Sequence, residues 1–173
     1  MNIRPAALHR ESAADSFKAA MRHLAGGVSI VTSGQDDERN GITATSVSSL
    51  SAEPPALIAC INRSCALLPV IRERGTFGVN ILAAGHRDLA DRFAGRHGVR
   101  GAERYADGDW IELVTGAPLL SDALAAIDCT VDSIIDWNSH ALVIGRVEAV
   151  QLGGASQALV YWRGGYHDIG GTE

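Results

Sequence analysis

The sequence is short of several residue types and segments, and each shortage excludes a class of protein. Its 173 residues include only three cysteines (Cys60, Cys65 and Cys129), which cannot all pair and whose spacing matches no zinc site. The longest apolar runs, such as 56–61, are far too short to cross a bilayer. The N-terminus lacks the apolar segment of a signal peptide. We therefore expect a soluble, cytoplasmic protein with reduced thiols and no membrane segment.

Lysine is almost absent, since Lys18 is the only lysine among 15 basic residues. We attribute this first to genomic bias and second to phosphate recognition by arginine. The net charge of −5 argues against a nucleic-acid-binding surface. A hydrophobic content of 46% with 20% charged residues is ordinary for a globular protein. The length suits one domain, which we expect to span residues 1–173.

The sequence also lacks the short motifs of several enzyme classes. There is no G-x-G-x-x-G for a Rossmann fold, no Gly-Lys pair for a P-loop and no G-x-S-x-G for a serine hydrolase. The six histidines form no H-E-x-x-H pattern, and we predict no metal site. The chemistry must therefore rest on another kind of site.

Hydrophobic periodicity predicts many strands and few helices. Helices are expected at 12–24, 62–74 and 86–96, and strands at 28–33, 56–61, 76–82, 125–137, 141–150 and 158–162. In the first helix an apolar face recurs at helical spacing before Gly26-Gly27, and consists of Phe17, Ala20, Met21 and Leu24. Residues 34–40 and 97–109 are charged loops, the second Gly-rich and mobile. Without regular alternation of strand and helix, this order predicts an antiparallel barrel.

Residues 41–55 contain the most unusual composition. Hydroxyl side chains occupy six of nine positions from Thr43 to Ser51, and no charge occurs before Glu53. An extended backbone with small side chains and exposed amides would suit a planar, hydrogen-bonding heterocycle. The alternative is a Ser/Thr-rich edge strand that runs into a turn at Pro54-Pro55. Composition alone leaves both interpretations open.

The order of segments resembles the short-chain flavin reductase family. The similar segments include Gly-Ile-Thr-Ala-Thr-Ser at 41–46, Cys-Ile-Asn-Arg-Ser at 60–64 and Leu-Val-Tyr-Trp-Arg-Gly-Gly-Tyr-His at 159–167. Others lie at 17–32, 49–55, 77–82, 91–95, 116–125 and 139–147, so the resemblance covers roughly residues 14–168. It implies a mainly β fold with flanking helices, an FMN-binding split β-barrel of the antiparallel Greek-key type. It also implies a homodimer, with FMN or FAD as flavin and NADH or NADPH as reductant.

The resemblance assigns roles to particular positions. The residues beside the flavin ring would be Thr43, Ala44, Thr45, Ser46, Val47 and Ser48, mostly through backbone amides. The segment Cys60, Ile61, Asn62, Arg63 and Ser64 would hold the flavin phosphate, with Ser64 as N-cap of the following helix. Phe93, Tyr166 and His167 would line the same site, although each also suits a packing role. Cys60 could be a redox partner, but without a basic neighbour we favour packing.

One turn departs from the family pattern. Where relatives commonly have Gly-Asp-His, this chain has Asn138-Ser139-His140. By resemblance His140 would position the nicotinamide, whereas a lone histidine at the start of a strand is otherwise structural. The altered residues leave open how the nicotinamide or the electron acceptor is recognised.

The resemblance implies an NAD(P)H-dependent flavin reductase that transfers hydride to FMN or FAD, with the protein binding and orienting the flavin. The reduced flavin would be supplied to a partner monooxygenase. One alternative is a reductase with bound FMN that acts on another acceptor, such as the cobalt of cob(II)yrinic acid a,c-diamide, a corrinoid. Another is a non-catalytic barrel that binds flavin or haem.

Overall fold

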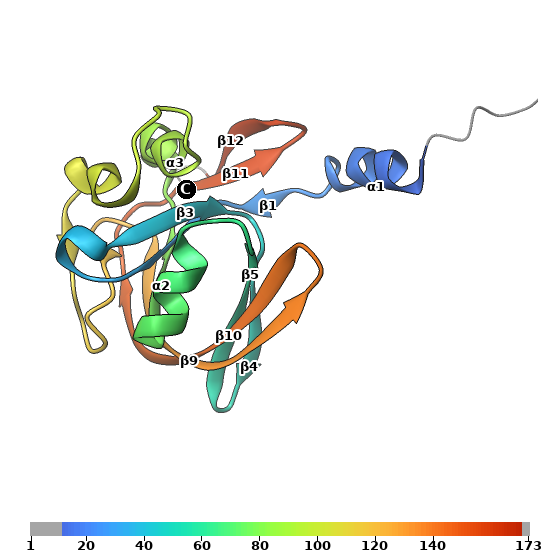
Figure 1. Cartoon of the computed structure of the whole chain (residues 1–173). Coiled ribbons are helices and arrows are strands. Elements are labelled where there is room, and N and C mark those ends of the chain that lie inside the picture. Colours follow the sequence, from blue (N-terminus) through green and yellow to red (C-terminus); the bar gives the residue numbers. More distant parts are fainter. Residues whose placement is uncertain (1–11, 171–173) are drawn as a thin grey trace, which may run out of the picture.

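Seven antiparallel strands form the main sheet of the computed structural model, which describes residues 12–170 (Figure 1). Across the sheet the order is β3 (Asn40–Ala44), β2 (Ser29–Ser33), β6 (Thr76–Ile81), β9 (Ala125–Trp137), β10 (His140–Leu152), β5 (Pro55–Asn62) and β4 (Val47–Ala52). The edge strands β3 and β4 are consecutive in the chain and are joined only by Thr45 and Ser46. Because two residues span so little distance, the sheet must curl until its edges nearly meet. The predicted antiparallel split barrel is confirmed.

Smaller elements cover the barrel. A second sheet contains β1 (Gly26–Gly27), β11 (Ala158–Trp162) and β12 (Gly165–Ile169), and a third contains β7 (Trp110–Ile111) and β8 (Leu119–Leu120). The helices are α1 (Ala13–Met21), α2 (Leu67–Arg74) and α3 (Arg87–Phe93). Short 3₁₀ helices lie at Asp36–Glu38, Ala84–His86 and Gly101–Ala106. Within residues 12–170, no helix is both long and apolar enough to span a membrane.

The predicted boundaries agree with the observed ones best for the strands. Residues 125–137 form one strand, β9, as predicted. The predicted helix at 62–74 begins only at Leu67, with Ala66 as N-cap, so Ser64 does not cap it. The predicted helix at 86–96 ends at Phe93 because Gly95 adopts a φ of 82°. Gly26-Gly27 belongs to a short strand rather than acting only as a helix stop.

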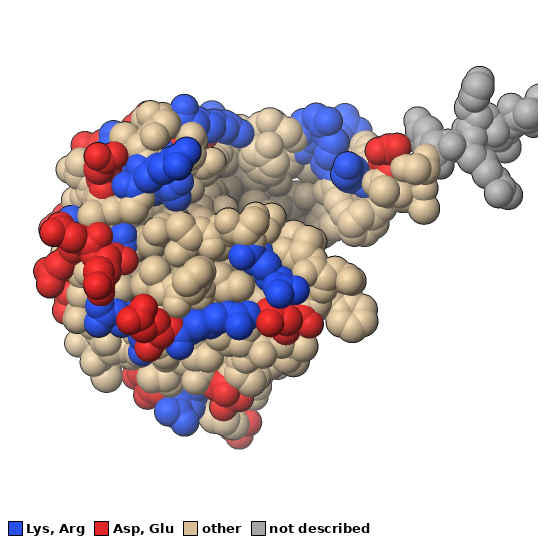
Figure 2. All heavy atoms as spheres, in the orientation of Figure 1, with Lys and Arg blue, Asp and Glu red and all other residues tan. Residues whose placement is uncertain are grey.

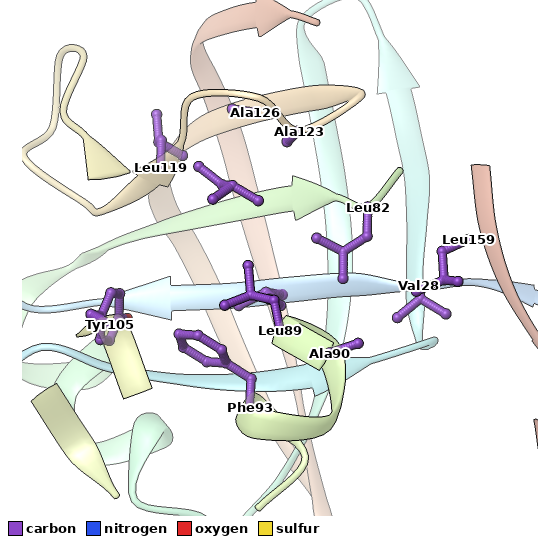
Figure 3. Close-up of a cluster of buried hydrophobic side chains, with 12 residues drawn as sticks. Val28, Leu82, Leu89, Ala90, Phe93, Tyr105, Leu119, Ala123, Ala126 and Leu159 are labelled. Carbon is purple, nitrogen blue, oxygen red and sulfur yellow. The ribbon is translucent and has the colours of Figure 1, made fainter. Parts of the chain in front are cut away.

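Two clusters of buried side chains form the core. One surrounds α2 and includes Ile61, Phe77 and Val143. The other includes Phe93 and Tyr105, whose ring centroids lie 5.0 Å apart at nearly a right angle (Figure 3). Such edge-to-face packing adds to the stabilisation that burial alone provides. The second cluster therefore fixes α3 against the β3 edge of the barrel.

The prediction of a mobile loop at 97–109 is wrong. The 3₁₀ helix within it buries Tyr105, whose hydroxyl donates a hydrogen bond to the Asn40 carbonyl at 2.6 Å. The Arg104 guanidinium donates to the carbonyls of Gly41 at 2.6 Å and Phe93 at 3.2 Å. Burial lowers the pKa of Arg104 from its ordinary value, an effect that the Tyr105 hydroxyl partly opposes. These two side chains attach the loop to β3 and α3.

The first helix forms, but its apolar face is not buried within this chain. Phe17 is 64% exposed and Leu24 65% exposed, and no residue of α1 is buried. The helix begins with Ser12, whose hydroxyl accepts a hydrogen bond from the Asp15 amide at 3.2 Å. Figure 1 shows α1 standing away from the barrel, beyond β1. The amphipathic pattern thus predicts a helix correctly without identifying what its apolar face contacts.

Candidate functional site

The hydroxyl-rich segment lies at the split between the two edges of the barrel. The Thr43 hydroxyl donates to the Ala90 carbonyl of α3 at 2.6 Å, and the Ser46 hydroxyl donates to the Cys60 carbonyl at 2.7 Å. The Cys60 amide in turn donates to the Ser46 carbonyl at 3.0 Å. Within residues 12–170, the amides of Thr45 and Ser46 have no hydrogen-bond acceptor. The hydroxyls of Thr43 and Ser46 are thus satisfied by the protein, while two amides remain available to a ligand.

A hollow of about 220 Å³ lies beside this segment. It brings together β3, the end of α3 and the β11–β12 hairpin, and its lining comprises Val28, Thr43, Ala44, Thr45, Ala94, Arg96, Tyr161 and Tyr166. We call it the barrel-split hollow. Thr43, Ala44, Thr45 and Tyr166 were predicted from the resemblance as site residues, and the structure brings them together here. Residues far apart in the sequence therefore share one cavity.

Arg96 is held in this hollow by the turn that ends α3. The Gly95 amide donates to the Arg92 carbonyl at 3.1 Å, and the Arg96 amide donates to the Asp91 carbonyl at 3.0 Å. This pair of bonds is the Schellman arrangement, which requires the left-handed conformation of Gly95. The Arg96 guanidinium also lies 2.6 Å from the Asp91 carboxylate. The turn thus reverses the chain and fixes a cation beside the hollow.

Two tyrosines form another wall of the barrel-split hollow. The rings of Tyr161 and Tyr166 lie 5.4 Å apart, edge to face, and the Arg96 guanidinium lies 5.5 Å from the Tyr166 ring centre. Burial, followed by the negative charge of Asp91, raises the pKa of Tyr166 to about 12. The Tyr166 hydroxyl is therefore neutral at physiological pH and can donate a hydrogen bond.

A second group of predicted residues meets where β5 pairs with β10. His140 lies opposite Asn62 in this register. The Asn62 side-chain oxygen accepts hydrogen bonds from the Ser64 amide at 2.9 Å and the Ser64 hydroxyl at 2.8 Å. His140 Nδ1 lies 2.9 Å from the Ser139 hydroxyl. We call Asn62, Arg63, Ser64 and His140 the β5–β10 cluster.

Arg63 is oriented by the tip of the β9–β10 hairpin. Its guanidinium donates to the Asn138 carbonyl at 3.1 Å, and its amide donates to the Ser139 carbonyl at 2.9 Å. The Asp136 carboxylate lies 3.7 Å from Arg63 but 2.6 Å from Arg72. The hydrogen bond from Arg72 is the main reason that the pKa of Asp136 is below its ordinary value. Because Arg72 is its closer partner, Asp136 holds Arg63 only weakly.

Several predicted site residues do not join these groups. Phe93 is only 1% exposed and packs against both Tyr105 and Trp110, so its side chain belongs to the core, the alternative role expected for it, and the structure gives no support to its flavin contact. The Ile61 side chain is fully buried, which leaves only its backbone for a ligand. His167 packs near Trp162, with ring centres 5.7 Å apart, and does not line the barrel-split hollow.

Val47 and Ser48 line a different cavity. This hollow of about 430 Å³ is mainly apolar, and its walls include Leu57, Ile127 and Val147. The predicted flavin-contacting segment is therefore divided, because β4 turns away from β3 after Ser46. The cysteine Cys60 is half-buried on β5 and, like the other two cysteines, is a free thiol.

Sequence reasoning missed Arg96, Tyr161, Ala94 and Val28 as lining residues. Only Arg96 carried a usable signal, since it directly follows Gly95, and a glycine after an amphipathic helix predicts a reversed chain. Tyr161 and Val28 occur in strands whose apolar pattern indicates burial but not which cavity they face.

The residues present fit a phosphorylated flavin. Unpaired amides at the barrel split can donate to the polar edge of a heterocycle, and the half-exposed Arg63 offers a cation to a phosphate. Tyr161 and Tyr166 offer aromatic surface and hydroxyl groups. A bound flavin would supply the redox chemistry, and the chain would supply its orientation and its electrostatic surroundings.

Comparisons with known proteins identify the family of the chain. The flavin reductase like domain matches residues 21–170. The chain is 38% identical over 153 residues to the FMN reductase (NADH) RutF of Variovorax paradoxus, covering 88% of this chain and 84% of that protein. A candidate flavin reductase from Haemophilus somnus has a TM-score of 0.86 at 32% identity, covering 91% of this chain and 100% of that one.

A further solved structure belongs to a two-component system. BorF, the flavin reductase component of a bacterial two-component tryptophan halogenase, superposes with a TM-score of 0.84 at 30% identity, covering 92% of this chain and 99% of BorF. Sequence, fold and site thus lead to one assignment: the chain belongs to the flavin reductase like domain family.

Proposed function

We propose that this protein is an NADH-dependent FMN reductase. The observation that carries the proposal is the barrel split, where unpaired amides of Thr45 and Ser46 adjoin a hollow walled by Arg96 and Tyr166. The relatives named as NADH-dependent FMN reductases support the choice of both flavin and reductant. In this proposal the amides bind the polar edge of the flavin and stabilise negative charge that develops there during reduction.

The β5–β10 cluster contacts the flavin phosphate and the nicotinamide end of the reductant. Arg63 binds the flavin phosphate, since its guanidinium is half exposed and already oriented by Asn138. His140 orients the nicotinamide end of the reductant from the opposite strand. Proximity and orientation account for the rate enhancement, and no side chain needs to act as a general base.

Reduced flavin then passes to a separate monooxygenase component. This part of the proposal is supported by the similar structure of nitrilotriacetate monooxygenase component B and by BorF, the flavin reductase component of a two-component halogenase. The free thiols of Cys60, Cys65 and Cys129 favour a reducing compartment, and we place the protein in the cytoplasm.

We further propose that the protein works as a homodimer. Exposed apolar side chains occur on β4, β9 and β10, where Leu50 is 50%, Trp137 69% and Leu152 78% exposed. Large exposed apolar surfaces of this kind mark interaction sites in soluble proteins. Sedimentation equilibrium should give twice the chain mass, and a Trp137→Glu variant should shift the equilibrium towards monomer. A monomeric wild type would contradict the proposal.

The activity is tested by following NADH oxidation by the purified protein with FMN as the varied substrate. We expect turnover that saturates with FMN and transfer of electrons to a second acceptor downstream. NADPH, FAD and cob(II)yrinic acid a,c-diamide are tested in parallel. A corrinoid-dependent rate with no turnover of free FMN would favour the corrinoid reductase. A bound flavin that neither reductant reduces would indicate a binding protein.

A further inference from the structure

Arg96 is the only charged residue that lines the barrel-split hollow within residues 12–170. The remaining wall is apolar or carries hydroxyl groups, and it includes Thr43 and Thr45 of the segment proposed to contact the flavin. The Arg96 side chain is half exposed, so the core does not enclose its charge. A single cation on a wall that is otherwise uncharged acts directly on any charge that a bound ligand gains.

Asp91 on α3 is the counter-ion of Arg96. The Arg96 Nη1 atom lies 2.6 Å from the Asp91 Oδ1 atom, and no other carboxylate in the described part of the chain pairs with this guanidinium. Asp91 also faces Tyr166, which forms another wall of the hollow. After burial, the charge of Asp91 and a hydrogen bond with its carboxylate are the next causes that raise the pKa of Tyr166 to about 12. One carboxylate is therefore shared by two side chains that line the hollow.

A hydrogen bond attaches this pair to the barrel split. The Thr43 hydroxyl donates at 2.6 Å to the carbonyl of Ala90, the residue before Asp91. Thr43 belongs to β3, which leads directly to the unpaired amides of Thr45 and Ser46. The ion pair and the amides are thus attached to one strand, and a ligand bound at the amides lies within the field of the pair.

Reduction of the flavin changes the charge at this place. Hydride transfer from NADH gives the neutral oxidised flavin two electrons and one proton, and it leaves NAD⁺ and a reduced flavin with one negative charge. A cation beside the flavin therefore favours the reduced form, whereas a carboxylate favours the oxidised form. Because Arg96 and Asp91 are paired, each limits the effect of the other.

We propose that the Arg96–Asp91 pair sets the ratio of the affinities for reduced and oxidised flavin, with Arg96 in contact with the flavin and Asp91 as its counter-ion. The proposal rests on the proposed function, since it assigns a further role at the same flavin site. Arg96 stabilises the negative charge of the reduced flavin. Asp91 limits this stabilisation, so that the reduced flavin can leave for a separate protein.

The test compares two variants with two matched controls. Arg96→Gln removes the cation, and Asp91→Asn removes the carboxylate while it keeps the shape of the side chain. The controls, Arg87→Gln and Asp168→Asn, break a similar pair: Arg87 is also a half-exposed arginine of α3, it lies 2.8 Å from the Asp168 carboxylate, and neither residue lines the barrel-split hollow. Figure 2 shows acidic and basic side chains interspersed over one face of the molecule. Water and salt screen such distant charges, so the controls should behave like the wild type.

The measured quantity is the ratio of the Kd of reduced FMN to that of oxidised FMN, from anaerobic titrations with chemically reduced and with oxidised FMN. Arg96→Gln should raise this ratio about three- to tenfold, since water screens a half-exposed guanidinium in part. A tenfold change corresponds to a fall of about 30 mV in the two-electron potential of bound FMN, which is measured independently. Asp91→Asn should lower the ratio by a similar factor.

An unchanged ratio in folded Arg96→Gln, or an equal change in Arg87→Gln, would overturn the proposal. A change in Asp91→Asn in the same direction as in Arg96→Gln would also overturn it, because a counter-ion must act with the opposite sign. Arg96→Lys keeps the charge and should retain most of the wild-type ratio; a ratio equal to that of Arg96→Gln counts against a role of the charge. A wild type that shows these affinities but whose bound FMN is not reduced by NADH contradicts the proposed function alone.

Discussion

Replacing Arg63 with alanine should weaken FMN binding more than any other single change in the β5–β10 cluster. The guanidinium of Arg63 is oriented by the Asn138 carbonyl at 3.1 Å and is only loosely held by Asp136 at 3.7 Å. It can therefore bind a phosphate without first breaking a strong ion pair. A hydrogen bond between charged groups contributes about 1.5–3 kcal/mol.

The exposure of Arg63 reduces this value. Its side chain is 50% exposed, so water screens part of the attraction. We expect a loss of about 1–3 kcal/mol in binding free energy, which raises the Kd of FMN by a factor between about 5 and about 150. Arg63→Lys should recover part of the loss, because lysine keeps the charge but not the bidentate geometry.

The assay is quenching of flavin fluorescence as the protein is titrated into FMN. Arg74→Ala serves as the control, since Arg74 is also an exposed arginine paired with a carboxylate, that of Glu38, and lies at the other end of α2. The Kd of FMN for the Arg74→Ala variant should equal that of the wild type. Urea unfolding of each variant shows whether the fold is intact. An unchanged Kd for Arg63→Ala in a folded protein would refute the phosphate role.

Substitutions of His140, Gly41 and Cys129 test three further features of the structure. His140→Ala should raise the KM for NADH and leave the Kd of FMN unchanged, whereas loss of folding would indicate that His140 is structural. Gly41→Ala should lower the free energy of unfolding by about 1–3 kcal/mol, because the added Cβ would lie 2.6 Å from Phe93 Cε1; an unchanged urea midpoint would contradict the packing. Burial is the main cause that raises the pKa of the Cys129 thiol to about 12 from an ordinary 9.0. Its contribution to stability is therefore complete below pH 9.0 and is lost as the pH rises towards about 12, so Cys129→Ala should make the loss of stability with rising pH less steep in unfolding experiments.

The strands of this fold could be predicted from the sequence because burial on a pleated sheet leaves a clear pattern. The predicted strand at 125–137 has the bounds of β9. The structure of the loop at 97–109 could not be predicted from the sequence, because its composition indicates a solvated segment. In the structure Arg104 and Tyr105 attach this loop to β3 and α3. One or two anchoring side chains can thus determine whether a loop packs against the protein, whatever its average composition.

The site was predictable only in part, for a related reason. Asn62 and His140 meet through the register of β5 and β10, which periodicity does not determine. The resemblance to a family assigned both residues to the site, Asn62 to the flavin phosphate and His140 to the nicotinamide, but did not pair them. Phe93 shows the opposite limit, because an aromatic residue on an amphipathic helix has the same pattern whether it contacts a ligand or the core.

The central claim, that this chain reduces a bound flavin with NADH, is tested most directly by a single-turnover experiment. Protein loaded with FMN is mixed anaerobically with NADH in a stopped-flow instrument, and the visible absorbance of the oxidised flavin is followed. We expect rapid bleaching at a rate that saturates with NADH, and we expect the absorbance to recover when oxygen is admitted. An FMN-loaded, folded protein that stays yellow with both NADH and NADPH would contradict it.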